Sequence, residues 1–243
     1  IVGFKPTYGL VPSDGCFPLA ASFDHVGPMA STVEACEAML RALAPGFEST
    51  ELPAGVRWAV AWTDRADPLV AERVQAVARL FDAEALDFPQ TSDTYALFMR
   101  EVADVHRDLY ADNGDLYGDD VAVKIERCLE IGETDARAAA RAREEYRVSA
   151  ERALDGYDLL LTPTLAMVAP ATGIGDAALR ERMIRFTYPF NALGWPALAV
   201  PCGSAEDGLP ASVQIVAKHG DDALVLAAGR AVSSLLRGTP AGS

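Results

Sequence analysis

Three short apolar runs in the second half of the chain constrain its fold more than any other feature. Residues 157–163, Tyr-Asp-Leu-Leu-Leu-Thr-Pro, form a run that ends in proline, which is typical of an interior strand delivering a loop at its carboxyl end. Residues 197–201 and 212–216 are two more runs of strand length. A turn-rich segment containing Asp207-Gly208 joins them, which predicts a hairpin. The chain therefore needs a sheet with buried strands.

Helical patterns surround these strands. Residues 56–62 form a further apolar run of strand length, and a helix beginning at Asp67-Pro68 follows it, so the two make an α/β unit. Ser31 and Glu34 form a capping box for a helix over 32–43. The pattern also predicts a weaker strand at 86–89 and helices at 92–111, 119–131 and 134–155. Asp221 or Asp222 begins a final helix, with inward positions expected at Leu224, Ala228, Ala231 and Leu235.

The first thirty residues contain too many prolines and glycines for a helix, so they predict turns and short extended pieces. We expect one domain over 1–243. Its parts are loops and a helix at 1–44, a strand and helical middle at 56–155, and C-terminal strands and a helix at 156–237.

Composition excludes several classes of function. The net charge of -14 and pI near 4.6 argue against nucleic acid or an anionic membrane as partner, because both need a basic surface. No run approaches the roughly 20 apolar residues of a membrane span. The four cysteines lie far apart, which fits unpaired thiols in a reducing cytoplasm. His106 and His219 have no ligand cluster at metal spacing. We expect no metal, no cofactor and a cytoplasmic location.

Ser22, Asp24 and His25 hold every residue type of a hydrolytic triad within four positions. Neighbours in a short segment rarely place a histidine ring between a nucleophile and a carboxylate, so we expect no triad here. Asp24 should instead accept backbone N–H bonds in a tight loop. Lys5 should be structural, with its head group reaching carbonyls or water.

Four segments together resemble the amidase signature family. They are residues 1–30 (Ile-Val-Gly-Phe-Lys-Pro-Thr-Tyr-Gly through Pro-Leu-Ala-Ala-Ser-Phe-Asp-His-Val-Gly-Pro-Met-Ala), 157–164, 189–203 and 207–216. They occur in family order across nearly the whole chain, whereas residues 45–155 resemble the family only loosely. The resemblance implies an α/β fold with a mixed β-sheet flanked by helices, an α/β/α sandwich that is incomplete in this chain.

The resemblance implies hydrolysis of carboxylic amides by a serine nucleophile, with a second serine in a cis peptide and a lysine as base relay. In the family these residues precede the segment that resembles Ile1 to Ala30, so no residue of this chain matches a catalytic position. We therefore expect a fragment that is inactive alone and whose partner is the missing N-terminal portion of the same domain. Its expected contribution is part of the sheet and one wall of the pocket for a small-molecule amide substrate.

For that wall we predict loops at strand ends, because ligands bind α/β sheets there. The candidate substrate-binding residues are Thr162, Pro163 and Thr164 after one strand and Phe190, Asn191 and Trp195 before the next. Aromatic residues around 186–195 favour an aryl or alkyl amide. No acidic residue stands at 184–188, where the related glutamine amidotransferase subunits carry one, so an amidotransferase is the less favoured assignment.

Two other hypotheses stay open. The chain could be a non-catalytic binding or complementing subunit, or a stand-alone hydrolase that uses Ser22 or a cysteine. An unpaired strand edge would favour assembly, including a homo-oligomer.

Overall fold

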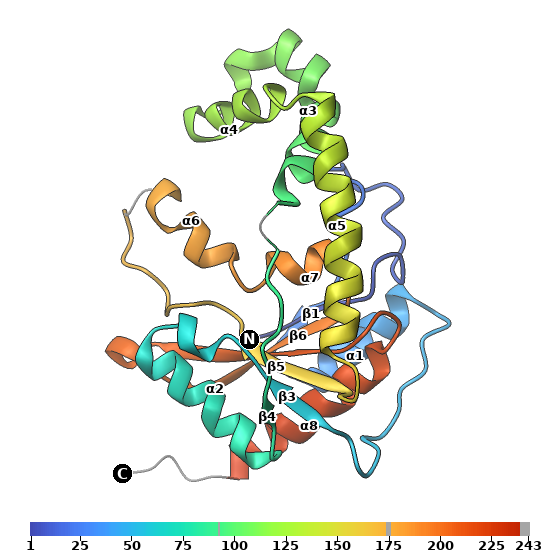
Figure 1. The fold of residues 1–243 in the computed structure, drawn as a ribbon, viewed down its shortest axis with the longest axis vertical. Helices are drawn as coiled ribbons and strands as arrows, with labels where there is room; N and C mark the ends of the chain where they lie inside the picture. The colour runs from blue at the N-terminus through green and yellow to red at the C-terminus, as the bar shows by residue number, and fades with distance from the viewer. Residues whose placement is uncertain (92, 174–175, 239–243) are drawn as a thin grey trace.

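The computed structural model describes residues 1–91, 93–173 and 176–238 of the chain. In these residues seven strands form one sheet in the order β2-β1-β6-β7-β5-β3-β4 (Figure 1). The strands are β1 (Val2–Lys5), β2 (Met29–Ala30), β3 (Trp58–Val60), β4 (Glu84–Ala85), β5 (Leu159–Pro163), β6 (Ala197–Ser204) and β7 (Pro210–Val216). Two of them belong to the first thirty residues, as the prediction of short extended pieces requires.

The sheet is mixed. β3, β4 and β5 run parallel to one another, whereas β5–β7, β7–β6, β6–β1 and β1–β2 are antiparallel. β6 and β7 form the predicted hairpin, with Ala197 opposite Val216 and a register shift between Pro201 and Gly203. The mixed α/β fold expected from the sequence is confirmed.

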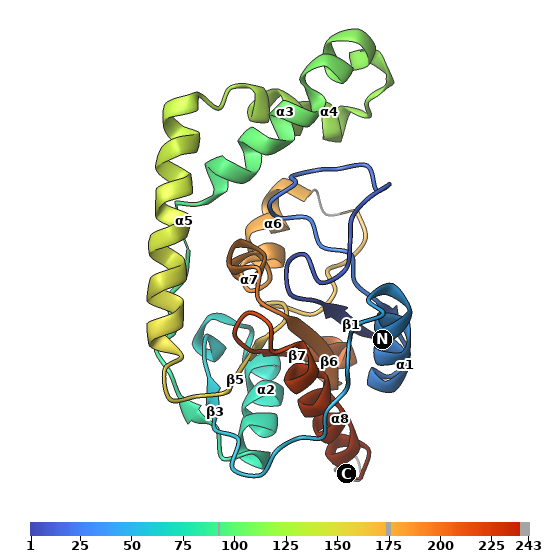
Figure 2. The same ribbon diagram turned by 90° about the vertical axis from the view of Figure 1, so that its right-hand side faces the viewer.

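Helices cover both faces of the sheet. They are α1 (Val33–Leu43), α2 (Pro68–Leu80), α3 (Tyr95–Asn113), α4 (Asp119–Leu129), α5 (Glu133–Ala153), α6 (Asp176–Ile184), α7 (Tyr188–Leu193) and α8 (Asp222–Gly238). α1, α2 and α8 share one apolar cluster with the strands, whereas α7 and parts of α3, α4 and α5 contribute to a second cluster on the opposite face. Figures 1 and 2 show α3 and α4 projecting away from the sheet, with the long α5 linking them back to it.

β5 is the centre of both clusters. All five of its residues are buried; Leu159 and Leu161 pack into the cluster with α1, α2 and α8, and Leu160 packs into the other. Side chains alternate between the faces of a strand, so a strand covered on both faces must be apolar throughout. The interior strand predicted from residues 157–163 is confirmed.

Several boundaries differ from the prediction. The cap of α1 is Thr32 rather than Ser31, and its hydroxyl accepts the N–H of Ala35 at 3.2 Å. The strand expected at 86–89 lies earlier, at β4, where pairing with β3 decides its position. The predicted start of the 92–111 helix falls at residue 92, outside the described residues, and α3 begins at Tyr95.

The inward face of α8 was also predicted wrongly in part. Its buried apolar residues are Val225, Leu226, Ala227, Ala228 and Val232. Leu235 is 44% exposed. The apolar residues cover a broad sector of the helix, so periodicity alone does not choose which part of that sector faces the sheet. Tertiary contact does, since Gly229 lies so close to β6 that a Cβ there would stand 2.1 Å from Leu198 Cδ2.

A buried arginine ties the helical arm to the N-terminal loop. The Arg143 guanidinium on α5 donates to the Ser22 hydroxyl at 2.6 Å, to the Ser22 carbonyl at 2.8 Å and to the Ala192 carbonyl at 2.7 Å. The Ser22 hydroxyl in turn donates to Glu101 on α3 at 2.6 Å. Arg143 also stacks over Phe23, 4.1 Å from the ring centroid. Side chains from α3 and α5 therefore hold Ser22 in place.

Candidate functional site

A cavity of about 290 Å³ lies beside the antiparallel half of the sheet. Its walls come from β1, the segment leading into β2, the residue after β5, α7 and its cap, and strands β6 and β7. Its polar lining residues are Lys5, His25, Thr164, Thr187, Asn191 and Gln214. The remainder of the lining is glycine, alanine, Phe4 and Met29, and none of the described lining residues is Asp or Glu.

A wider depression of about 520 Å³ lies at the carboxyl ends of β3 and β4. It contains none of the predicted site residues and, among the residues described there, no buried side-chain nitrogen or oxygen without a partner. Two residues that line the smaller cavity, His25 and Thr164, each have one such atom, Nε2 and Oγ1 respectively. Buried polar atoms without partners are rare and costly, so we take the smaller cavity as the candidate site.

Lys5 belongs to β1 and lines one wall of the cavity. Its ammonium donates to the Pro6 carbonyl at 3.1 Å and to the Trp195 carbonyl just before β6, as expected for a head group that reaches carbonyls. Burial lowers the pKa of Lys5 to about 7, although the nearby Asp222 carboxylate acts in the opposite direction. The charge on this wall therefore changes near neutral pH.

The turn after Lys5 is held by the start of α8. Asp222, a buried carboxylate, accepts the Thr7 N–H at 2.8 Å and the Thr7 hydroxyl at 2.5 Å. The Thr7 hydroxyl also accepts the Gly220 N–H at 3.0 Å. Lys5 and Thr7 thus link β1 to two distant segments. Lys5 binds the segment before β6 and Thr7 binds the start of α8, which explains why these residue types stand together.

Ser22, Asp24 and His25 do not form a triad. Asp24 accepts backbone N–H bonds inside its own loop at 2.8 to 3.2 Å, as predicted. Ser22 is bound to Glu101, and the His25 Nδ1 atom is 2.7 Å from the Phe23 carbonyl oxygen. Burial, reinforced by the Lys5 charge, lowers the pKa of His25 to about 4, so its ring is neutral at pH 7.

Gln214 on β7 connects the cavity to β5. Its side-chain nitrogen donates to the Thr162 hydroxyl and to the Phe186 carbonyl, both at 2.9 Å, and the Thr162 hydroxyl donates to the Pro163 carbonyl at 3.1 Å. Thr162 is fully buried, so these bonds satisfy polar groups in the core.

The structure brings two of the six predicted site residues to the cavity, Thr164 and Asn191. Thr162 and Pro163 are buried in β5, directly behind Thr164. Phe190 and Trp195 are buried in an aromatic cluster with Trp62, Phe88 and Phe186, at centroid separations of 5.5 to 6.2 Å. Phe186, Phe190 and Trp195 therefore pack in the core, and Tyr188 packs against Phe23 and Tyr95, so none of the aromatic residues that favoured an aryl amide lines the cavity.

The segment around Asn191 is a helix rather than the expected loop. α7 has Pro189 in its first turn, and Gly194 ends it with a φ of 70°. Proline near the start and glycine just past the end are helix signals, and this signal was present in the sequence.

Sequence reasoning also missed Gln214, His25 and Gly27 as parts of the cavity wall. Gly27 has a local reason for its identity, because a Cβ there would stand 2.2 Å from the Phe4 carbonyl oxygen. All three lie inside the segments with family resemblance, which was the available signal.

Neither a metal site nor a membrane span is found in the described part of the chain. Across residues 1–91, 93–173 and 176–238, no group of three or more His, Cys, Asp or Glu residues could hold a metal ion. No helix among them is long and apolar enough to cross a bilayer. Cys36, Cys128 and Cys202 are buried and unpaired, while Cys16 is exposed.

Comparison with known proteins gives a consistent result. The family model described as Amidase matches residues 1–54 and 63–226. An amidase of Pseudomonas putida is 30% identical over 86% of this chain and 53% of its own length. A glutamyl-tRNA(Gln) amidotransferase subunit of Myxococcus xanthus is 30% identical over 95% of this chain and 58% of its own length.

The fold is shared as well. A crystal structure of an amidase superposes with a TM-score of 0.84 at 29% identity, covering 96% of this chain and 58% of that one. The chain thus spans little more than half the length of the relatives it matches.

Proposed function

Since this chain belongs to the amidase family, we propose that it forms one wall of the substrate site of an enzyme that hydrolyses carboxylic amides. One observation carries the proposal: segments far apart in the sequence that resemble the family meet at a single cavity. Lys5 and His25 come from the first segment, Thr164 from the second, Asn191 from the third and Gln214 from the fourth. Convergence of this kind is expected of a substrate site.

Within this site Thr164 and Asn191 contact the substrate. Thr162 and Pro163 hold the end of β5 in position behind Thr164, and Phe190 and Trp195 support α7 from the core. The described lining contains no carboxylate that could pair with an ammonium group. The site therefore suits an amide without a positive charge.

The nucleophile comes from a polypeptide segment outside these 243 residues. Ser22 is the serine nearest to the cavity-lining His25 in sequence, and its hydroxyl is engaged by Glu101 and Arg143. Family resemblance assigns the attack to a serine assisted by a second serine and a lysine. That serine adds to the amide carbonyl carbon, the amine leaves with a proton, and water then releases the carboxylic acid. The chain described here binds and orients the amide for this step.

Labelling with a fluorophosphonate probe tests the proposal. The 243-residue chain alone should not react, whereas the same chain preceded by the segment encoded upstream of Ile1 should be labelled and should release ammonia or amine from simple amides. Strong labelling of the chain alone would refute the proposal that the nucleophilic serine lies outside these 243 residues. Replacing Ser22 by Ala in the longer protein should leave labelling intact.

Part of a glutamine-dependent amidotransferase is the second candidate, favoured by the 30% identity to the Myxococcus xanthus protein. Glutamine carries an α-ammonium group, for which the described cavity lining provides no carboxylate. Hydrolysis of glutamine by the longer protein, faster than that of neutral amides, would reverse the ranking. A complementing role would instead show as association of this chain with a separate amidase N-terminal segment.

A further inference from the structure

Two parts of the cavity wall come from segments with little regular structure of their own. His25 and Gly27 belong to residues 20–27, called the Ser22 loop below, and Asn191 belongs to α7. Residues 6–28, all of them described, form no helix or strand. α7 has six residues, whereas an isolated helix needs about 12 to be stable in water. Both segments therefore depend on side chains from elsewhere for their position.

Arg143 on α5 is bonded to both segments. Its Nε donates to the Ala192 carbonyl of α7 at 2.7 Å, and its terminal nitrogens donate to the hydroxyl and the carbonyl of Ser22 at 2.6 and 2.8 Å. The guanidinium also lies over the Phe23 ring, which stacks on Tyr188 of α7 with 6.0 Å between the ring centroids. A guanidinium is planar and holds its donors in a fixed geometry, so one side chain sets the separation of the loop and the helix.

The helix that carries Arg143 gives it a firm base. α5 has 21 residues and buries four others besides Arg143, namely Ala136, Ala139, Tyr146 and Ala150. Arg143 itself is 5% exposed. On the loop side, the carbonyl of Phe23 lies 2.7 Å from His25 Nδ1, and on the helix side Ala192 directly follows Asn191. Each contact of Arg143 is thus close in the chain to a residue of the cavity lining.

We propose that Arg143 is a positioning residue for amide binding, which holds the Ser22 loop and α7 at the separation that the cavity requires. It is not among the residues that line the cavity, so it acts through the two segments. The inference rests on the proposed function, since it concerns the wall of the same site. A misplacement of about 1 Å can cost about a hundredfold in rate, so loss of this anchor should be measurable.

Kinetics of the longer protein, which includes the segment encoded upstream of Ile1, test this role. Arg143→Ala should lower kcat/KM for benzamide about tenfold, mainly through KM, because the wall contacts the amide both before and during attack. The rate of fluorophosphonate labelling should stay unchanged, since the probe reacts at a nucleophile proposed to lie outside these residues. Arg147→Ala is the control, because Arg147 is on the same helix and pairs with Glu144 at 2.7 Å. Unchanged kcat/KM in Arg143→Ala, or an equal loss of labelling, would overturn the inference.

Chemical rescue separates positioning from a general loss of structure. Arg143→Ala leaves the oxygens of Ser22 and Ala192 and the Phe23 ring around a vacated guanidinium site. Millimolar guanidinium chloride should therefore restore most of the lost kcat/KM, whereas urea, which is planar but uncharged, should not. Guanidinium weakens folding in general, so a variant that had only lost its fold would not recover. Absence of rescue would overturn the positioning role.

A second variant keeps the inference testable where Arg143→Ala does not fold, and it needs no catalysis. Arg143→Lys retains the charge but lacks the planar fork, so in the ¹⁵N-labelled 243-residue chain the amide resonances of Gly27 and Asn191 should shift. Arg147→Lys should leave both resonances in place. Shifts in Arg143→Lys without amide hydrolysis by the longer protein would retain the anchoring of the cavity wall and reject the amidase activity. Unshifted resonances in a protein that hydrolyses amides would do the reverse.

Discussion

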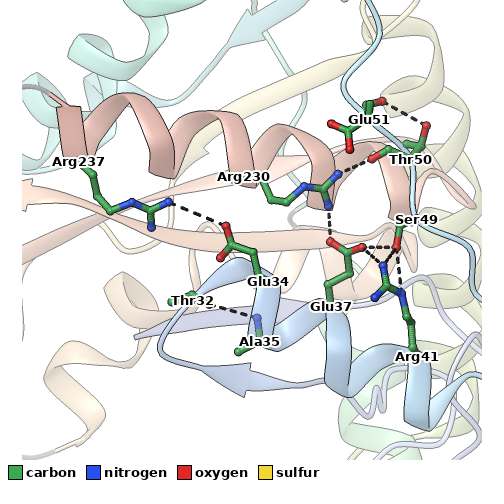
Figure 3. A network of polar contacts seen from close by, with 10 residues as sticks. All are labelled: Thr32, Glu34, Ala35, Glu37, Arg41, Ser49, Thr50, Glu51, Arg230 and Arg237. Atoms are coloured by element: carbon green, nitrogen blue, oxygen red, sulfur yellow. Dashed lines mark hydrogen bonds and ion pairs between the residues drawn. The ribbon is translucent and has the colours of Figure 1, made fainter.

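Neutralising Glu37 tests whether a buried carboxylate holds α1 against α8 (Figure 3). Glu37 is 4% exposed, and its two oxygens are bound by Arg41 on α1 and Arg230 on α8. The Arg41 contact is 2.8 Å long, and the Ser49 hydroxyl binds the same oxygen. Arg230 also donates to the Thr50 carbonyl. The carboxylate therefore joins two helices and the loop that follows α1.

The expected cost follows from the exposure of the partners. Glu37→Gln keeps the volume of the side chain but leaves two guanidinium groups without a counter-charge. Breaking a buried ion pair costs about 3–5 kcal/mol. The Arg41 side chain is 54% exposed and regains water, whereas that of Arg230 is 22% exposed. We expect a loss of about 2–4 kcal/mol of unfolding free energy, or about 6–12 °C at about 3 °C per kcal/mol.

The same pair of helices provides the control. Glu34 on α1 lies 3.9 Å from Arg237 on α8, and both side chains are more than half exposed. Exposed pairs of this kind contribute about 0–1 kcal/mol, so Glu34→Gln should change stability little. Urea unfolding followed by circular dichroism at pH 7 gives both values. The reasoning is refuted if Glu37→Gln is no more destabilising than Glu34→Gln, or if 0.5 M salt removes the difference.

Further substitutions test the packing of α8 on β6, the attachment of the N-terminal loop to α5, and the protonation of His25. Gly229→Ala should lower stability by about 1–3 kcal/mol because its Cβ overlaps Leu198, whereas Gly238→Ala, with open space around it, should not; thermal unfolding compares them. Arg143→Met should raise hydrogen exchange in the loop it holds, and unchanged exchange would contradict the anchoring role. Burial lowers the pKa of His25 to about 4, so the unfolded chain binds more protons between pH 4 and about 6.5. Stability should fall as pH drops through that window, and His25→Asn should flatten the fall in urea titrations.

Much of the secondary structure could be predicted from local pattern. The apolar run at 157–163 became a strand buried on both faces, and the runs at 197–201 and 212–216 became a hairpin, because uninterrupted apolar strands have few other stable placements. Helix α2 begins at Pro68 as expected and buries Val70, Val74 and Val77. Periodicity thus placed the buried face of α2 correctly.

The prediction failed where the pattern was ambiguous or went unused. The apolar sector of α8 is broad, so the part of it that faces the sheet was decided by the close approach of Gly229 to β6. α7 was missed although proline and glycine mark its two ends. β4 lies at Glu84–Ala85 rather than at the predicted 86–89. Its position is set by pairing with β3, which outweighs the weak strand preference of the local sequence.

For the candidate site, the sequence by itself determined the family segments and two of the lining residues, Thr164 and Asn191. Only the tertiary structure decided which side chains share a wall. Phe190 and Trp195 turned into the core, while Lys5, His25 and Gln214 came to one cavity from two strands and a loop. The reason is physical: a residue's chemistry is local, but its neighbours and free hydrogen-bonding atoms depend on the order and register of strands paired across roughly 200 residues of chain.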